Sequence, residues 1–149
     1  MATGMTSMLC RQGPRAGERQ RVRKHTCLPM PVHHLALRSS DPFRLAAFYA
    51  RALGLPELRR QEDEGGAYSV WLDLGGAVLM VERGESRDGA GDAGWDGLFL
   101  SAEPGTGEAW AQRWATLGIT LDGRTGCTLY ARDPEGNRFG VSSYPIALF

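Results

Sequence analysis

The sequence predicts an α+β fold that consists of two βαβββ modules. Three observations in its 149 residues lead to this prediction. Alternating polar and apolar runs indicate strands, and two helical stripes of apolar residues each end at a Leu-Gly pair. The order strand, helix and three strands then occurs twice, on either side of a glycine-rich segment. We therefore expect two modules that each leave one sheet face uncovered, so that their pairing completes the structure.

The domain boundaries follow from the same order of elements. We predict the first module at residues 32–83, a linker at 84–95 and the second module at 96–145, so one domain spans residues 32–145. Residues 1–31 carry six basic side chains and one acidic side chain, a net charge of +5, whereas the rest of the chain carries −5. This segment has Gly-Pro and Ala-Gly breaks and no aromatic residue, so we predict a disordered basic extension.

In the first module, a strand over residues 32–38 is predicted because polar and apolar residues alternate there. Asp41 and Pro42 then supply an N-cap and a first-turn proline for a helix. Gly54 is placed to end this helix. The apolar residues between recur at helical spacing and form one stripe toward a core: Leu45, Phe48, Tyr49, Ala52 and Leu53.

Three strands complete the first module, at residues 57–62, 68–74 and 77–82. The last two are joined by Gly75-Gly76, which indicates a tight hairpin that pairs Leu74 with Ala77. This register divides the hairpin into two faces. The apolar face holds Tyr68, Val70, Leu72, Leu74, Ala77, Leu79 and Val81. The mixed face, which we assign to a pocket, holds Ser69, Trp71, Asp73, Val78, Met80 and Glu82.

The second module repeats this order. Strands are predicted at residues 98–102, near Thr120, at 127–132 and at 138–144, the last two joined by a tight turn at 133–137. A helix between the first two strands begins near Thr106. Its apolar side chains Trp110, Trp114 and Leu117 share one face, so we expect both tryptophans in the core.

Composition limits the partners that we expect. The basic extension has no aromatic side chain to stack on a base, so we predict no nucleic-acid partner. No window approaches the roughly 18 consecutive apolar residues of a membrane span, so we predict no membrane partner and a cytoplasmic location. The chain has 3 cysteines without metal-ligand spacing, which we interpret as free thiols.

Three motifs in this order resemble the vicinal oxygen chelate superfamily, which includes glyoxalases, bleomycin-resistance proteins and extradiol dioxygenases. They are His33-His34-Leu-Ala-Leu-Arg-Ser-Ser-Asp41, then Phe48-Tyr49 with Leu53-Gly54-Leu55, and Asp133-Pro-Glu-Gly-Asn-Arg-Phe139. The resemblance implies two βαβββ modules around a funnel, with the helices outside and a ligand within. It also implies that metal-dependent members carry four ligands, one on each of the first and last strands of the two modules.

The resemblance assigns the first metal ligand to His34. Because side chains alternate along a strand, we expect His33 and His34 to point to opposite faces, with only His34 in the funnel. The other ligand positions fall on Met80, near Gly97 and on Gly140. None of these carries a suitable donor, and Glu82 is the nearest carboxylate, so we predict no metal cofactor; His34 and Glu82 are the candidates if a metal binds.

We therefore expect the funnel to bind a small organic molecule without a metal, with the two glycines leaving room for a bulkier ligand. The predicted ligand-binding residues are His34, Arg38, Trp71, Met80, Glu82, Arg138 and Tyr144. We expect a homodimer. Two alternatives stay open: a metal-dependent lyase, isomerase or dioxygenase of the same superfamily with a reduced site, and a non-catalytic regulatory module whose basic tail is functional.

Overall fold

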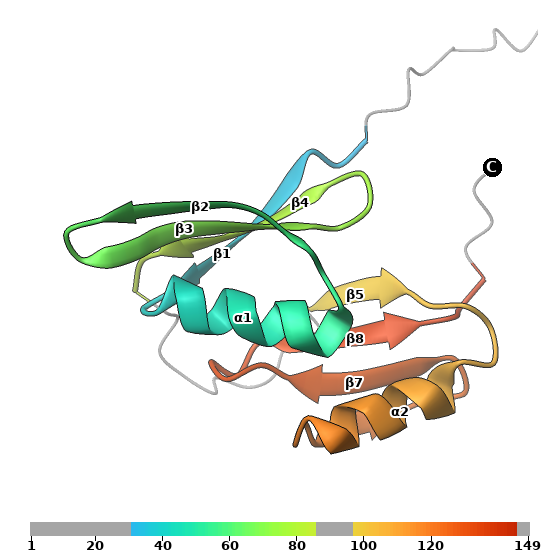
Figure 1. Ribbon diagram of the computed structural model, residues 1–149. Helices are drawn as coiled ribbons and strands as arrows, with labels where there is room; N and C mark the ends of the chain where they lie inside the picture. The colour runs from blue at the N-terminus through green and yellow to red at the C-terminus, as the bar shows by residue number, and fades with distance from the viewer. Residues whose placement is uncertain (1–30, 86–96, 146–149) are drawn as a thin grey trace, which may run out of the picture. The chain divides into compact units, whose positions relative to one another are not determined.

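The computed structural model describes residues 31–85 and 97–145. Two four-stranded sheets and two helices follow each other there in the predicted order (Figure 1). The first module consists of β1 (His34–Ser39), α1 (Pro42–Leu53), β2 (Glu57–Asp63), β3 (Gly66–Asp73) and β4 (Val78–Arg83). The second consists of β5 (Leu98–Ser101), α2 (Gly107–Thr116), β6 (Leu121–Arg124), β7 (Thr128–Arg132) and β8 (Arg138–Ser142). The predicted α+β fold of two βαβββ modules is confirmed.

Two predictions concern residues that the structure does not describe. The basic extension at residues 1–31 and the linker at residues 84–95 lie almost entirely outside the described residues. Of the two helices in the described ranges, neither has the length and hydropathy that crossing a membrane requires.

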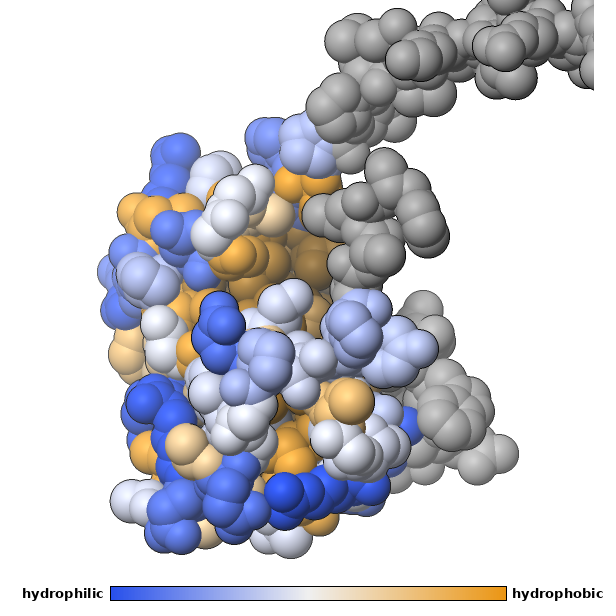
Figure 2. Space-filling model, turned by 90° about the vertical axis from the view of Figure 1, so that its right-hand side faces the viewer, coloured by the Kyte–Doolittle hydropathy of each residue, from blue (hydrophilic) through white to orange (hydrophobic). Residues whose placement is uncertain are grey.

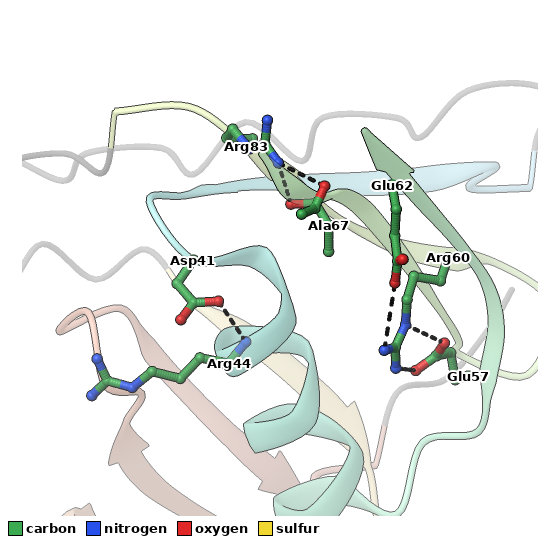
Figure 3. Close-up of polar contacts among 8 residues, drawn as sticks. Asp41, Arg44, Glu57, Arg60, Glu62, Ala67 and Arg83 are labelled. Atoms are coloured by element: carbon green, nitrogen blue, oxygen red, sulfur yellow. Dashed lines mark hydrogen bonds and ion pairs between the residues drawn. The ribbon is translucent and has the colours of Figure 1, made fainter. Parts of the chain in front are cut away.

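The local sequence determines both ends of α1. The Asp41 side chain accepts a hydrogen bond from the backbone N–H of Arg44 at 3.0 Å, which satisfies a donor that the helix leaves unpaired (Figure 3). Pro42 lies in the first turn, where its missing N–H removes no helical bond. Gly54 ends the helix in the left-handed conformation with a φ of 73°. The predicted boundaries of α1 are confirmed.

Sheet A has the strand order β1-β4-β3-β2, with β1 parallel to β4 and with β3 and β4 antiparallel. The hairpin register is the one that the two-residue link predicts, because the Leu74 N–H donates to the Ala77 carbonyl at 2.9 Å. Trp71 therefore lies opposite Met80. Arg83 connects the end of β4 to β3 by donating to the Ala67 carbonyl at 3.0 Å (Figure 3).

Sheet B repeats this arrangement with the order β5-β8-β7-β6 and a parallel β5–β8 pair. Two predicted strand boundaries are wrong. β7 begins at Thr128, so Cys127 lies outside the strand and is exposed. β8 ends at Ser142, so Tyr144 lies beyond the strand, and its backbone N–H donates to the Ser142 hydroxyl at 3.2 Å.

The two sheets share one hydrophobic core, because α1 packs against both of them. Leu45 and Tyr49 of α1 belong to the same buried cluster as Val70 and Val81 of sheet A. On its other side α1 meets sheet B, where the rings of Phe48 and Phe139 are 5.4 Å apart. We call the face of each sheet that packs on the helices its helix face, and the opposite face its open face.

α2 closes this core from the second module. The Trp114 side chain is buried, and its indole N–H donates to the Ala52 carbonyl of α1 at 3.0 Å. Trp110 is partly buried beside it, with the two rings 6.2 Å apart. The prediction that both tryptophans belong to the core is therefore confirmed, and the bond to Ala52 also fixes α2 against α1.

Some hydrophobic surface stays uncovered by the described residues. Figure 2 shows hydrophobic side chains gathered in a recess on one side of the molecule, above a border of hydrophilic side chains. The large hydrophobic residues that remain exposed include Leu35 in β1, which is 43% exposed, and Val32, two residues before that strand. β1 is an edge strand with β4 as its one neighbour in the described sheet, so this surface lies at a sheet edge.

Candidate ligand-binding site

The open face of sheet A carries most of the predicted site residues. Its helix face buries Val70, Leu72, Leu79 and Val81, which confirms the two faces predicted for the hairpin. The residues between them in sequence therefore project from the open face. Those that the sequence singles out on this face are His34, Arg38, Trp71, Met80 and Glu82, and the register of β1, β4 and β3 supports this placement.

The two adjacent histidines do not lie as predicted. β1 begins at His34, so His33 precedes the strand and the alternation of side chains does not apply to it. The two Nδ1 atoms are 2.9 Å apart, and both residues are exposed. The expectation that these imidazoles point to opposite faces is wrong, because it extended the strand two residues too far toward the N-terminus.

Ala36, Met80 and Trp71 form a row across the middle of this open face, on three neighbouring strands. Trp71 is half-buried, its indole N–H donates to the Ser69 hydroxyl at 2.8 Å, and the Arg59 guanidinium lies 5.2 Å from its ring centroid. Since Ala36 is small, the Trp71 ring and the Met80 thioether supply the apolar surface of this row.

The open face of sheet B has the corresponding row, with different side chains. Phe99 of β5, Gly140 of β8 and Tyr130 of β7 are neighbours across the three strands. β5 and β7 are separated by β8, which places their backbones roughly 9–10 Å apart. The Phe99 and Tyr130 rings are nevertheless only 5.4 Å apart, edge to face. They can meet because Gly140, between them, has no side chain.

The Phe99 ring also fills the space above two glycines. A Cβ atom at Gly140 would lie 2.7 Å from the Phe99 ring and would overlap the Leu129 carbonyl oxygen. A Cβ atom at Gly97 would lie 2.7 Å from the same ring and 2.9 Å from the Arg138 carbonyl oxygen. The room that the sequence analysis assigned to a bulkier ligand is therefore taken by Phe99, which that analysis did not single out.

Arg138 and Tyr144, the site residues predicted in the second module, both lie near this aromatic pair. The Arg138 guanidinium is 4.4 Å from the centroid of the Tyr130 ring, and its Nε lies 3.6 Å from a carboxylate oxygen of Asp122. Tyr144 is 69% exposed and lines a cavity of about 250 Å³ together with Phe99 and Tyr130. The hydroxyl side chains of Ser101, Thr128 and Ser142 complete its polar lining.

The donor set does not fit a divalent metal. The four positions to which the resemblance assigns ligands hold His34, Met80, Gly97 and Gly140, so one imidazole is the single strong donor among them. In the described ranges, no group of three or more His, Cys, Asp or Glu side chains is close enough to hold an ion.

The reduced site built on His34 and Glu82 is also not assembled. β1 pairs His34 with Val78 and Arg38 with Glu82, so the two candidate ligands are four positions apart along the sheet. This separation is about 13 Å, and side chains that stand perpendicular to a sheet do not converge over it.

Within one chain the two open faces do not enclose a common space. Both helix faces contribute to the same core, so each open face points away from that core. The described residues that line the cavity over Phe99 and Tyr130 all belong to the second module. The structure thus separates the predicted site residues into two groups, one on each sheet.

Comparison with known proteins agrees with this fold. The sequence matches a family model described as a glyoxalase-like domain over residues 34–142. No curated protein matches the chain. Among solved structures, the fosfomycin resistance protein FosX from Listeria monocytogenes is similar with a TM-score of 0.66 and 14% identity, over 77% of this chain and 92% of that one.

Two further solved structures show the same fold. Lactoylglutathione lyase from Agrobacterium tumefaciens has a TM-score of 0.63 and 21% identity, over 82% of this chain and 99% of that one. TioX from Micromonospora sp. ML1 has a TM-score of 0.56 and 23% identity, over 78% of this chain and 100% of that one. The family model over residues 34–142, together with the shared fold, confirms the resemblance to the vicinal oxygen chelate superfamily.

Proposed function

Since this chain belongs to the glyoxalase-like domain family, we propose that its open faces bind a small organic molecule without a metal ion. The observation that carries this proposal is the Phe99 ring, which covers Gly97 and Gly140, the two positions in the second module to which the resemblance assigns metal ligands. A larger residue at position 140 would overlap the backbone of β7, so a donor side chain cannot be accommodated there. The space near the two glycines serves apolar contact instead.

The side chains around this space suit an organic ligand. Trp71 and Met80 on sheet A, and Phe99 and Tyr130 on sheet B, offer apolar and aromatic surface. Polar groups stand beside them: His34, Arg38 and Glu82 on sheet A, and Arg138 and Tyr144 on sheet B. Binding sites for small molecules typically combine apolar walls with a few polar groups that orient the ligand.

The alternative is metal-dependent catalysis. One structure of FosX from Listeria monocytogenes contains Mn(II) and a dihydroxypropylphosphonic acid, so an enzyme of this fold can hold such an ion. In this chain one imidazole would have to replace a full ligand set, and a catalytic site generally needs about three protein ligands. The remaining alternative, a functional basic tail, concerns residues outside the described part of the chain.

The first experiment measures metal content and ligand binding on the same preparation. We expect elemental analysis of the purified protein, and titration with Mn(II), to show no one-to-one binding of Mn, Fe, Ni or Zn. We expect thermal shift against a library of metabolites and antibiotics to find stabilising compounds, because a ligand at 100 times its Kd adds about 2.7 kcal/mol of stability.

The variant His34→Ala separates the two functions. Stoichiometric metal that is lost in His34→Ala would overturn the proposal in favour of the metal-dependent enzyme. Compounds that stabilise the chain in the presence of a metal chelator, and that still bind to His34→Ala with at most a modest loss, would support it.

A further inference from the structure

We propose that the cavity on the open face of sheet B binds an uncharged, planar aromatic ring system, held against Phe99 and Tyr130. This inference rests on the proposed function and names the class of ligand that the second module selects. Nothing in the sequence motifs assigns a role to Phe99 or Tyr130. Three features of the cavity lead to the proposal: its aromatic wall, its uncharged polar lining and its size.

The aromatic wall exists because of the glycine between its two members. The Phe99 ring lies against the sheet above Gly97 and Gly140, and it meets the Tyr130 ring at 5.4 Å with an interplanar angle of 76°. Both rings are half-buried and both line the cavity, so each keeps part of its surface for a ligand. Edge-to-face aromatic pairs of this kind accept a further ring, in stacked or edge-to-face geometry.

The rigidity of the wall follows from the contacts behind it. The Arg138 guanidinium lies 4.4 Å from the Tyr130 ring centroid, and Asp122 holds the same guanidinium through its Nε at 3.6 Å. Asp122 also pairs with Arg132 at 3.2 Å. A Tyr130 ring that is fixed in this way loses little side-chain freedom when a ligand binds, which favours affinity.

The polar lining is uncharged. Ser101, Thr128 and Ser142 contribute hydroxyl groups, and the Thr128 and Ser142 hydroxyls are 2.8 Å apart, so one of them donates to the other. The hydroxyl that accepts this bond keeps its own proton for a carbonyl or hydroxyl substituent of a ligand. The described residues that line this cavity include no Asp, Glu, Lys or Arg, and the Arg138 guanidinium beside Tyr130 already faces Asp122, so this lining offers no counter-ion to a charged ring.

The size of the cavity limits what enters it. Its volume is about 250 Å³, whereas pockets for drug-sized ligands begin at roughly 300 Å³. It therefore accommodates a ring system of one or two fused rings, or that part of a larger ligand, and not a whole drug-sized molecule.

The test compares two probes that share a skeleton and differ in planarity. 2-Naphthol is planar and aromatic, whereas decahydro-2-naphthol is saturated and puckered, and both carry one hydroxyl group. The Kd of each is measured with the full chain by ligand-observed NMR titration, and amide chemical-shift changes locate the binding site. We expect 2-naphthol to bind more tightly and to shift the amides of Phe99, Tyr130 and Gly140.

Variants of Phe99 and a matched control identify the wall. Since an aromatic pair contributes about 0.5–1.5 kcal/mol beyond its buried area, Phe99→Ala is expected to raise the Kd of 2-naphthol roughly two- to twelvefold. Phe99→Leu keeps an apolar cover over the glycines but removes the aromatic ring, so it should weaken binding similarly. Phe99→Tyr keeps the ring and should preserve the affinity for 2-naphthol. Phe43→Ala is the control, because Phe43 is 48% exposed on α1 and packs under the Arg60 guanidinium at 4.3 Å.

Three outcomes would overturn the inference: equal Kd values for the two probes, no binding of 2-naphthol, or an affinity that Phe99→Ala and Phe99→Leu leave unchanged. These outcomes are distinguishable from failure of the proposed function. If 2-naphthol does not bind while a non-planar compound binds to the open faces without a metal, only this inference fails, whereas a stoichiometric metal that depends on His34 would contradict the function itself.

Discussion

Gly140 shows how one missing side chain determines the chemistry of the candidate site. Met80 occupies the equivalent place in sheet A, between Ala36 and Trp71. At Gly140 the space above the strand is free, and Phe99 and Tyr130 fill it from either side. The second module therefore presents an aromatic surface at a position to which the resemblance assigns a metal ligand.

We predict that Gly140→Ala destabilises the protein by about 1–3 kcal/mol, the usual cost of adding atoms to a well-packed site. The added Cβ would overlap the Leu129 carbonyl oxygen and press on the Phe99 ring. The measurement is the free energy of unfolding in urea. Gly126→Ala is the matched control, because no heavy atom lies within 4 Å of a Cβ built at Gly126. A Gly140→Ala variant as stable as Gly126→Ala would contradict this account of Gly140.

At the scale of an element, the turn between β7 and β8 connects the second module to the first by side-chain hydrogen bonds. Asp133 accepts hydrogen bonds from the backbone N–H groups of Glu135 and Asn137 and from the Asn137 side chain, at 2.8–2.9 Å. Its fourth partner is the Tyr49 hydroxyl of α1, at 2.8 Å. The Ser39 hydroxyl at the end of β1 donates to Glu135 in the same turn. The turn therefore connects β1 and α1 to sheet B.

We predict that Tyr49→Phe lowers the free energy of unfolding by about 1.5–3 kcal/mol at neutral pH, the range for a hydrogen bond to a charged group. The hydroxyl and the carboxylate are both buried, so Asp133 would lose a donor that water cannot replace. Tyr144→Phe removes a hydroxyl from a side chain that is 69% exposed and serves as the control. Equal stability of the two variants would contradict a stabilising role of the Tyr49–Asp133 hydrogen bond.

Because of the buried Tyr49 phenol, we also predict that the stability of the protein depends on pH in the alkaline range. Burial, and then the neighbouring Asp133 carboxylate, raise the pKa of the Tyr49 phenol above its ordinary value of 10.0. At high pH the folded chain therefore keeps a phenol proton that the unfolded chain releases. The contribution of the Tyr49 phenol to the free energy of unfolding is complete below pH 10. Stability then falls as the pH rises above 10, by up to about 1.4 kcal/mol per pH unit for one proton. The stability difference between wild type and Tyr49→Phe should narrow over this range in urea unfolding at pH 8–11.

At the scale of the whole molecule, the packing of α1 against both sheets decides which surfaces remain free. Both helix faces enter one core, and the open faces stay outside it. β1 and β5 are edge strands with one neighbour each in the described sheets. An unpaired strand edge beside apolar side chains is a surface that another chain can cover. A funnel with walls on both sides would thus need a second copy, in which sheet A of one chain faces sheet B of the other.

We predict a homodimer on this basis. Sedimentation equilibrium at tens of micromolar is expected to give about twice the chain mass of 16.2 kDa. Leu35→Asp should lower this mass, because Leu35 is 43% exposed on edge strand β1. Leu58→Asp is the matched control, since Leu58 is 54% exposed on β2 at the opposite edge of the same sheet. A single-chain mass for the wild type would exclude this arrangement.

The sequence by itself determined the order of the elements in this protein and the register of the β3–β4 hairpin. Helix α1 was predictable because its cap, its apolar stripe and its terminal glycine lie within a few residues of one another. The two faces of the β3–β4 hairpin were predictable because a two-residue link leaves one register. These signals are local, so they can be recognised in the sequence without knowledge of the rest of the fold.

Only the tertiary structure decided what the open faces contain and where they point. Phe99 reaches Tyr130 across an intervening strand, and no spacing along the chain reveals that a side chain lies over Gly97 and Gly140. The separation of the two groups of site residues likewise depends on how α1 packs between the sheets. Both results come from contacts between residues that are distant in sequence, and such contacts are set by the packing of whole elements rather than by any periodic pattern.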